Sequence, residues 1–404
     1  MIRKSDNKHQ LRASAIDRGF APVGLTTINR KITIQLSVIT LAAVMGHSLC
    51  VSQGLAQQPV TQPSSALPQI DPRPDAFARA QGPAPAPPLL GGDALQKPGV
   101  PVGKLSAPLT LSSVAYDGMV SRYWIYVPAQ YDPQKPAAVM IFQDGEGYLN
   151  RAGDHPALNV IDNLIAQGKI PVMIAVFVNP MEIATGSPDT PTYKFVEAYG
   201  KRWGRTLQDS MRSVEYDTVS DRYPLFLRNE LIPEVSRHYN LRKDAYSHAI
   251  TGSSSGGICA FNAAWQMPDT FSRVISWIGS FTGIQWRDDP AISDGGQDYP
   301  DKILHEAHRN VRVLLQDGSN DLEWTYGSWP MANIRMANAL KSKGYDFRFS
   351  FGQGRHSSAW GGAEFADEMT WLWRGYDPNK TEDTFLQEAS EASKPPFRVT
   401  IVNR

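Results

Sequence analysis

The 404-residue sequence has few cysteines and no excess of charge of either sign. Its cysteines are Cys50, in an apolar N-terminal segment, and Cys259, so a disulfide within the folded part is not expected. The 40 basic and 40 acidic side chains cancel, which removes the electrostatic basis for binding nucleic acid or an anionic membrane surface. No zinc-type spacing of histidine and cysteine occurs, and the acidic run from Asp317 has Ser328 where a calcium loop needs glutamate. We therefore expect no metal and no cofactor.

Residues 1–56 have the pattern of a secretory signal. A polar, basic region precedes an apolar run over 32–51, and small residues follow it. A retained membrane anchor is the alternative, which the polar Gln35 and His47 inside the run disfavour. Apart from this segment no membrane contact is expected, and the protein is expected in the periplasm or outside the cell.

Three segments follow the signal. Residues 57–108 are rich in proline, alanine and glutamine, a composition that cannot bury enough apolar surface to offset ordering and so predicts a disordered linker. Residues 109–382 are expected to form one folded domain, and residues 383–404 a C-terminal tail.

The order of apolar segments in the domain predicts an α/β fold. Continuously apolar runs are typical of central parallel strands, and helical periodicity separates them along the chain. Alternation of this kind predicts a doubly wound α/β domain with a mostly parallel central sheet and helices on both faces. The expected strands are 109–114, 122–127, 137–142, 172–178, 246–250, 273–278, 311–315 and 347–351. Two stretches, 179–218 and 282–301, are expected to be irregular and to shape a site.

A Gly-x-Ser-x-Gly motif, 252–256, lies between a predicted strand and a predicted helix. In that setting the motif forms a sharp turn that lifts its serine, here Ser254, out of the sheet as a nucleophile. The neighbouring N–H groups at the helix start point toward any anion formed beside the serine. The alternative is a plain glycine- and serine-rich loop.

A serine nucleophile needs a histidine base and an acid that orients it, in the chain order serine, acid, histidine. His356 lies in a glycine-flanked loop after the last predicted strand, where the base is expected. The acid lies in the loop after strand 311–315, where Asp317, Asp321 and Glu323 compete. We favour Asp321, which is far enough along the loop to turn back toward the histidine, whereas Asp317 fits an Asp-Gly turn.

Two N–H donors are expected to bind the oxyanion. One is the backbone of Ser255, directly after the nucleophile. The other comes from the glycine-containing loop 143–148, where the N–H of Glu146 is favoured and Gly145 is the alternative.

Candidate substrate-binding residues are Trp286, Trp360 and Arg212. Tryptophans in loops can stack on a sugar or an aromatic acid, as Trp324 and Trp329 also could, unless these rings only pack under their loops. Arg212 could equally form a structural ion pair with Glu215 at helical spacing.

The chain resembles an esterase family of α/β-hydrolases that includes enterochelin, feruloyl and acetylxylan esterases, esterase D and the mycolyltransferases. The resemblance spans about 109–373 and rests on segments 122–128, 142–145 and 226–233, the serine motif, 318–321, and His356 with Trp360. In the family the acid lies in a Gly-x-x-Asp loop, which matches Asp321, and the second oxyanion donor follows an Asp-Gly pair, which matches Glu146.

The sequence thus predicts a secreted serine esterase that acts through an acyl-enzyme on a small-molecule or polysaccharide ester. Enterochelin-like lactones and feruloyl or acetyl esters of polysaccharides both fit. Several arginine or lysine side chains around the site would favour the catecholate ester, whereas aromatic side chains and neutral hydrogen-bond donors would favour the sugar ester. An acyltransferase with the same three residues, or a non-catalytic binding module on a hydrolase scaffold, are the alternatives.

Overall fold

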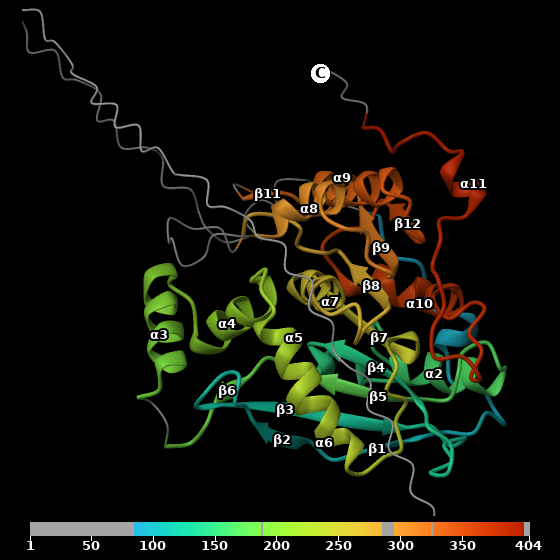
Figure 1. Cartoon of the computed structure of the whole chain (residues 1–404), viewed down its shortest axis with the longest axis horizontal. Coiled ribbons are helices and arrows are strands. Elements are labelled where there is room, and N and C mark those ends of the chain that lie inside the picture. The colour runs from blue at the N-terminus through green and yellow to red at the C-terminus, as the bar shows by residue number, and fades with distance from the viewer. Residues whose placement is uncertain (1–84, 187–188, 285–294, 325, 400–404) are drawn as a thin grey trace, which may run out of the picture. The chain divides into compact units, whose positions relative to one another are not determined.

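The computed structural model describes residues 85–186, 189–284, 295–324 and 326–399 (Figure 1). The predicted signal, most of the predicted linker and Trp286 lie outside these residues. None of the helices in the described ranges is both long and apolar enough to span a bilayer.

A mixed sheet forms the centre of the fold, and within the described residues its main path runs β1-β3-β5-β4-β7-β8-β9-β12. The six strands from β5 to β12 on this path are parallel, while β1, β2, β3 and β6 pair antiparallel at one edge. The strands are β1 (Lys104–Leu105), β2 (Leu109–Ser112), β3 (Met119–Val127), β4 (Ala138–Gln143), β5 (Met173–Val178), β6 (Glu182–Ile183), β7 (His248–Ser253), β8 (Arg273–Trp277), β9 (Arg312–Gly318) and β12 (Phe347–Gly352). A separate hairpin pairs β10 (Glu323–Trp324) with β11 (Gly327–Ser328).

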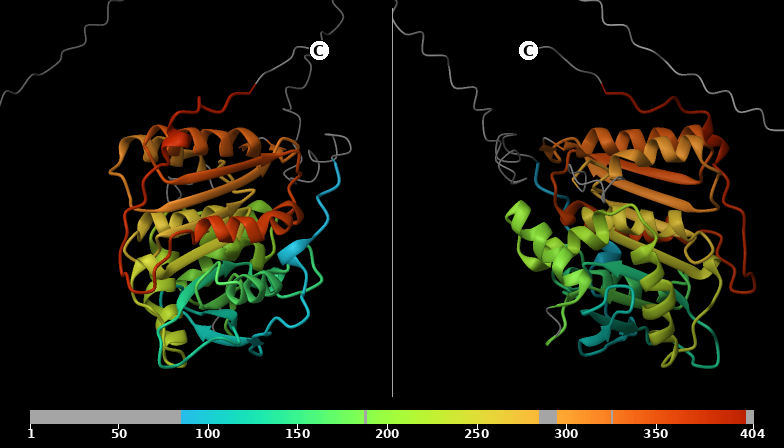
Figure 2. Two further views of the ribbon diagram at one scale, coloured as in Figure 1. Left: turned by 90° about the vertical axis from the view of Figure 1, so that its right-hand side faces the viewer. Right: turned by 60° about the vertical axis from the view of Figure 1, so that its left-hand side comes forward.

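Helices cover both faces of this sheet, which confirms the predicted fold class (Figure 2). Because β4, β5, β8 and β9 are buried along their whole length, and β7 at every residue but its last, each face needs its own apolar cover. One face packs on α2 (Ala157–Ala166) and α10 (Ser358–Leu372). The other packs on α5 (Arg222–Phe226), α6 (Ile232–Ser236), α7 (Ser255–Gln266), α8 (Tyr299–His305) and α9 (Trp329–Ser342).

The stretch 179–218 is not irregular, which corrects the expectation. It contains β6, α3 (Pro191–Trp203), α4 (Leu207–Arg212) and a π-helical turn (Ser213–Asp217). Thr190 caps α3 by accepting the N–H of Tyr193, and Gly204 ends the helix with φ +62°. Threonine at the start of a helix and glycine at its end are ordinary helix start and stop signals. In Figure 1, α3 and α4 lie beyond the carboxyl ends of β4 and β5.

The chain after α10 packs against the domain. Phe385 is buried, and its backbone N–H donates to the side chain of Asn310. Further on, α11 (Ala389–Ala392) precedes Phe397, whose ring meets those of Phe347 and Phe349 edge-on. The described part of the predicted C-terminal tail is therefore in contact with the sheet and its helices.

Candidate active site

Ser254 occupies a strained turn between β7 and α7. Its backbone has φ 59° and ψ −120°, a region that L-residues rarely adopt, and its N–H donates to the carbonyl of Trp277 on β8 at 2.9 Å. In this turn the backbone at Gly252 lies so close to the backbone at Gly256 that a side chain does not fit. A Cβ on Gly252 would lie 2.5 Å from the carbonyl carbon of Gly256. This is the geometry of a nucleophile elbow.

The structure brings Ser254, His356 and Asp321 together in one hydrogen-bonded chain. His356 Nε2 lies 2.8 Å from Ser254 Oγ, and His356 Nδ1 lies 2.6 Å from Asp321 Oδ1. A carboxylate accepts only, so Nδ1 carries the proton and Nε2 is left to accept the serine hydroxyl. Asp321 is fully buried, whereas 22% of the His356 side chain is exposed. A substrate could therefore reach the histidine but not the acid.

The two competing acids have other partners. Glu323 is exposed and accepts the hydroxyl of Ser328 at 2.8 Å. Asp317 is fully buried at the end of β9, where it accepts from the N–H of Gly318 at 2.7 Å and from Asn333 Nδ2 at 2.8 Å. Burial, and then the charge of Asp321, raise the pKa of Asp317 well above its ordinary value. Of the three carboxyls, Asp321 is the one bonded to the histidine.

Ser280, which the sequence did not single out, and Trp329 complete the surroundings of the serine. Ser280 Oγ lies 3.2 Å from Ser254 Oγ and accepts the indole N–H of Trp329 at 3.1 Å. The Trp329 ring is buried and stands edge-on to His356, with 5.7 Å between ring centroids. Ser280 follows β8, so the rule that sites gather at the carboxyl ends of strands could have found it.

The expected oxyanion donors lie on two elements. Ser255 opens α7, so its N–H belongs to the first helical turn, which has no intrahelical acceptor. Glu146 lies in a 3₁₀ turn, Gly145–Tyr148, where its N–H donates to Asn179 Oδ1 at 3.0 Å. Asn179 Nδ2 in turn donates to Glu146 Oε2 at 3.0 Å. To bind an oxyanion, the N–H of Glu146 would first have to release the side-chain oxygen of Asn179.

Arg212 pairs with Asp144 and not with Glu215. Its Nε and Nη2 donate to the two carboxylate oxygens of Asp144 at 2.8 and 2.7 Å, and both side chains are about one-third exposed. Asp144 has φ 56° and lies close to the elbow, since a Cβ on Gly256 would come within 3.0 Å of its Oδ2. Glu215 is instead buried and accepts the N–H of Met181 at 2.9 Å. Burial raises the pKa of Glu215 well above its ordinary value.

The tryptophans pack under their loops to different degrees. Trp360, on α10, packs against the histidine loop, because a Cβ on Gly354 would lie 2.9 Å from its ring. Trp324 is buried with Trp329 in a small apolar cluster. These contacts explain how the loops are held, and they leave Trp360 partly exposed.

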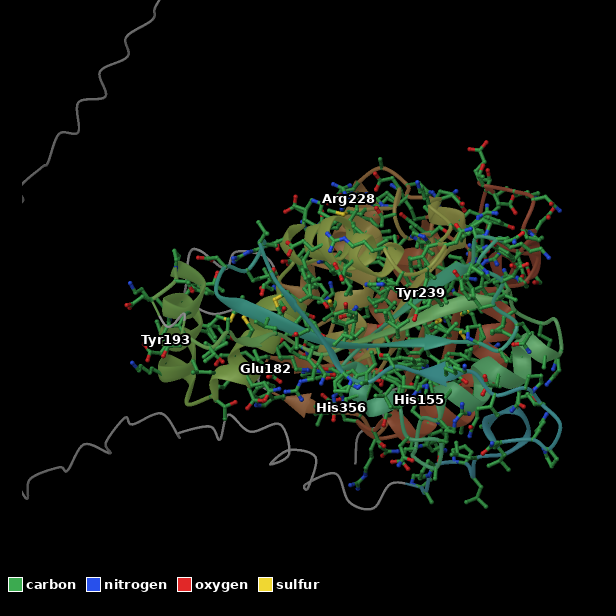
Figure 3. The ribbon with its side chains drawn as sticks, turned by 90° about the horizontal axis from the view of Figure 1, so that it is seen from below. His155, Glu182, Tyr193, Arg228, Tyr239 and His356 are labelled. Atoms are coloured by element: carbon green, nitrogen blue, oxygen red, sulfur yellow. The ribbon has the colours of Figure 1, made fainter. Side chains whose placement is uncertain are left out.

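An apolar cavity of about 220 Å³ lies where α3 and α4 meet the antiparallel edge of the sheet. Thioethers contribute much of its lining, which consists of Met119, Met181, Met211, Val196, Leu207 and Ile183 together with the polar Glu182 and Gln208. In Figure 3, Glu182 lies between Tyr193 of α3 and His356 in the view. No group of side chains suited to holding a metal ion is found in the described residues.

Comparison with known proteins places this geometry in a family. The model of the family described as "Putative esterase" matches residues 121–372, more than half of the chain. The chain belongs to this esterase family. A curated relative, the iron(III) enterobactin esterase of Dickeya dadantii, is 23% identical over 64% of this chain, but the match covers only 52% of that relative. The chain thus spans about half the length of the curated relatives it matches.

Solved structures of esterases share the fold. A ferulic acid esterase matches with a TM-score of 0.50 at 18% identity, covering 68% of this chain and 99% of that one. The enterobactin esterase of Shigella flexneri, solved with 2,3-dihydroxy-N-benzoyl-serine, matches with a TM-score of 0.50 at 19% identity. That match covers 71% of this chain and 63% of the other. These likenesses establish an α/β-hydrolase-like fold for the esterase domain.

Proposed function

We propose that this protein is a secreted serine carboxylester hydrolase. The observation that carries the proposal is the hydrogen-bonded chain from Ser254 through His356 to Asp321, set on a strained elbow. Membership of the esterase family supports the same reaction class. The long apolar run near the N-terminus is the reason for proposing export.

In the proposed reaction Ser254 Oγ attacks the ester carbonyl carbon while His356 Nε2 takes its proton. The bond from the carbonyl carbon to the alcohol oxygen then breaks, and His356 returns the proton to the leaving alcohol. Water resolves the acyl-enzyme by the same route and leaves a carboxylic acid. Asp321 keeps Nδ1 protonated throughout and stabilises the imidazolium. The N–H groups of Ser255 and Glu146 hold the oxyanion, the latter after releasing Asn179.

The charge around the site bears on the choice of ester. A catecholate lactone that carries several negative charges would need uncompensated cations, but the charge of Arg212 is already balanced by Asp144. This pairing favours a neutral ester, such as a feruloyl or acetyl ester of a carbohydrate, over an enterochelin-like lactone. Parallel assays of feruloyl, acetylxylan and catecholate esters would separate the two classes.

The proposal is tested by a burst assay with p-nitrophenyl acetate on the full chain. We expect the wild type to release one equivalent of nitrophenol rapidly and Ser254→Ala to release none. Ser253→Ala is the matched control, because its hydroxyl faces Tyr148 and not His356, and it should keep the burst. A Ser254→Ala variant as active as wild type would refute the nucleophile, and an alcohol acceptor that outcompetes water would indicate an acyltransferase.

A further inference from the structure

Two backbone hydrogen bonds hold Ser254 against the segment that ends β8. The Ser254 N–H donates to the carbonyl of Trp277 at 2.9 Å, and the Ser254 carbonyl accepts the N–H of Ser280 at 3.1 Å. Ser280 is fully buried, and its Oγ lies 3.2 Å from Ser254 Oγ. The backbone bonds that hold the elbow therefore also place a second hydroxyl beside the nucleophile.

The indole of Trp329 orients the Ser280 hydroxyl. Trp329 is buried at the start of α9, and its Nε1–H donates to Ser280 Oγ at 3.1 Å. An indole nitrogen only donates, so Ser280 Oγ accepts this bond and its own hydrogen is left for another acceptor. Among the described residues, the other side-chain atom within hydrogen-bond distance of Ser280 Oγ is Ser254 Oγ.

His356 decides the direction of the bond between the two hydroxyls. Its Nδ1 donates to Asp321, which leaves Nε2 as an acceptor 2.8 Å from Ser254 Oγ. The hydrogen of Ser254 therefore points to Nε2, and Ser254 Oγ can only accept from Ser280. All these bonds thus run one way, from the indole through the two hydroxyls to the imidazole.

We propose that Ser280 is a fourth catalytic residue of the esterase site, whose hydroxyl donates a hydrogen bond to Ser254 Oγ in both halves of the reaction. The inference rests on the proposed function. In acylation, Oγ gains negative charge as its proton moves to His356 Nε2 and its bond to the carbonyl carbon forms.

The same oxygen carries charge again in deacylation. His356 Nε2 takes a proton from the attacking water, the bond from the acyl carbon to Ser254 Oγ breaks with its electron pair returning to Oγ, and Nε2 passes the proton to Oγ. Ser280 keeps its own proton throughout. Its hydrogen bond stabilises the charge on Oγ in both transition states, so it should act on both steps alike.

Ser280→Ala removes this donor without adding atoms. With p-nitrophenyl acetate and the full chain, the rate constant of the burst and that of the steady phase should each fall about tenfold, as expected for the loss of one hydrogen bond to a charged oxygen. KM should stay unchanged, because both steps slow by the same factor. Rate constants equal to those of the wild type, or a fall confined to one phase, would overturn the proposal.

Ser276→Ala is the matched control. Ser276 is a fully buried serine of β8, and its hydroxyl has no hydrogen-bond partner among the described residues. Its removal should leave both rate constants as they are in the wild type. A loss in Ser276→Ala equal to that in Ser280→Ala would mean that any buried hydroxyl at β8 has this effect, and it would overturn the proposal.

A double-mutant cycle tests the chain of hydrogen bonds. If Trp329 acts through the hydroxyl of Ser280, Trp329→Phe should slow both phases about fivefold in the wild type and have no further effect in the Ser280→Ala background. Effects that multiply in the double variant would show that the indole and the hydroxyl act separately, and they would refute the chain. Urea unfolding of each variant checks that the compared proteins are folded.

The outcome separates this inference from the proposed function. A wild type without a burst, or a burst that survives Ser254→Ala, removes the proposed function and the inference with it. A wild-type burst that Ser254→Ala abolishes and Ser280→Ala leaves unchanged removes the inference alone.

Discussion

His155 should make the protein lose stability in mild acid. The side chain is 2% exposed and is enclosed by the rings of Tyr148, Trp277 and Phe365, with centroids 4.9, 4.2 and 4.9 Å away. Neither ring nitrogen has a hydrogen-bond partner among the described residues. Burial therefore lowers the pKa of His155 from 6.5 to about 3, and the folded protein holds it neutral.

The size of the effect follows from the two pKa values. Above pH 6.5 His155 is neutral in both states, so its full contribution to stability is present. As the pH falls below 6.5, His155 binds a proton in the unfolded chain, whereas in the folded chain it stays neutral down to about pH 3. Integrated over pH, this difference in proton binding lowers the free energy of unfolding by about 2 kcal/mol from pH 7 to pH 5 and by about 3 kcal/mol from pH 7 to pH 4.

Urea unfolding at a series of pH values, with and without His155→Phe, measures this contribution. Phenylalanine is slightly larger, so it costs about 1–3 kcal/mol of packing energy at every pH, but it cannot titrate. The difference between variant and wild type should therefore shrink by about 2 kcal/mol from pH 7 to pH 5. His305→Gln, at an exposed position, is the control and should follow the wild type throughout. Parallel curves for His155→Phe and wild type would refute the reasoning.

Two further substitutions test how the serine is held. Trp329→Phe keeps the ring beside His356 but removes the N–H donated to Ser280, and the loss of one such bond, about 1 kcal/mol, should lower kcat for p-nitrophenyl acetate about fivefold with little change in KM. An unchanged kcat would show that Ser280 needs no orientation. Gly252→Ala places a Cβ against the backbone of Gly256 and should lower the free energy of unfolding by about 1–3 kcal/mol and reduce turnover. Gly147→Ala, where nothing lies within 4 Å of an added Cβ, should change stability by less than about 0.5 kcal/mol.

The sequence predicted the sheet and the Ser254–Asp321–His356 grouping because both depend on local signals. Buried strands are continuous apolar runs, and the carboxyl ends of parallel strands meet at one edge. The partner of Arg212 depends instead on contact at long range: Asp144 lies 68 residues away, and nothing at helical spacing indicates it. Glu215, the expected partner, is turned inward to Met181.

His155 shows a second limit of sequence reasoning. It stands just before α2, where no sequence pattern indicates burial, yet its side chain is 2% exposed. The rings that enclose it come from the loop after β4, from β8 and from α10, so only the packed fold brings them together. A single residue at a helix start carries no periodicity that could reveal such burial.

The choice of Asp321 over Asp317 follows from strand register. Gly318 of β9 pairs with Gly352 of β12, and the two loops leave the sheet at this level. Backbone bonds then tie the loops together, from the Ser319 N–H to the Gly352 carbonyl at 3.0 Å and from the Asn320 N–H to the Gly354 carbonyl at 3.1 Å.

His356 lies four residues beyond its last paired residue, so the acid that reaches it must also lie beyond the sheet. Asp321, three residues past Gly318, meets this condition, whereas Asp317 is still paired with Phe351 inside the sheet. Gly318 itself has no room for a side chain, because a Cβ there would lie 2.4 Å from the backbone nitrogen of Gly354. The distance of each carboxyl from the end of its strand, and not its chemical identity, therefore decides which one orients the histidine.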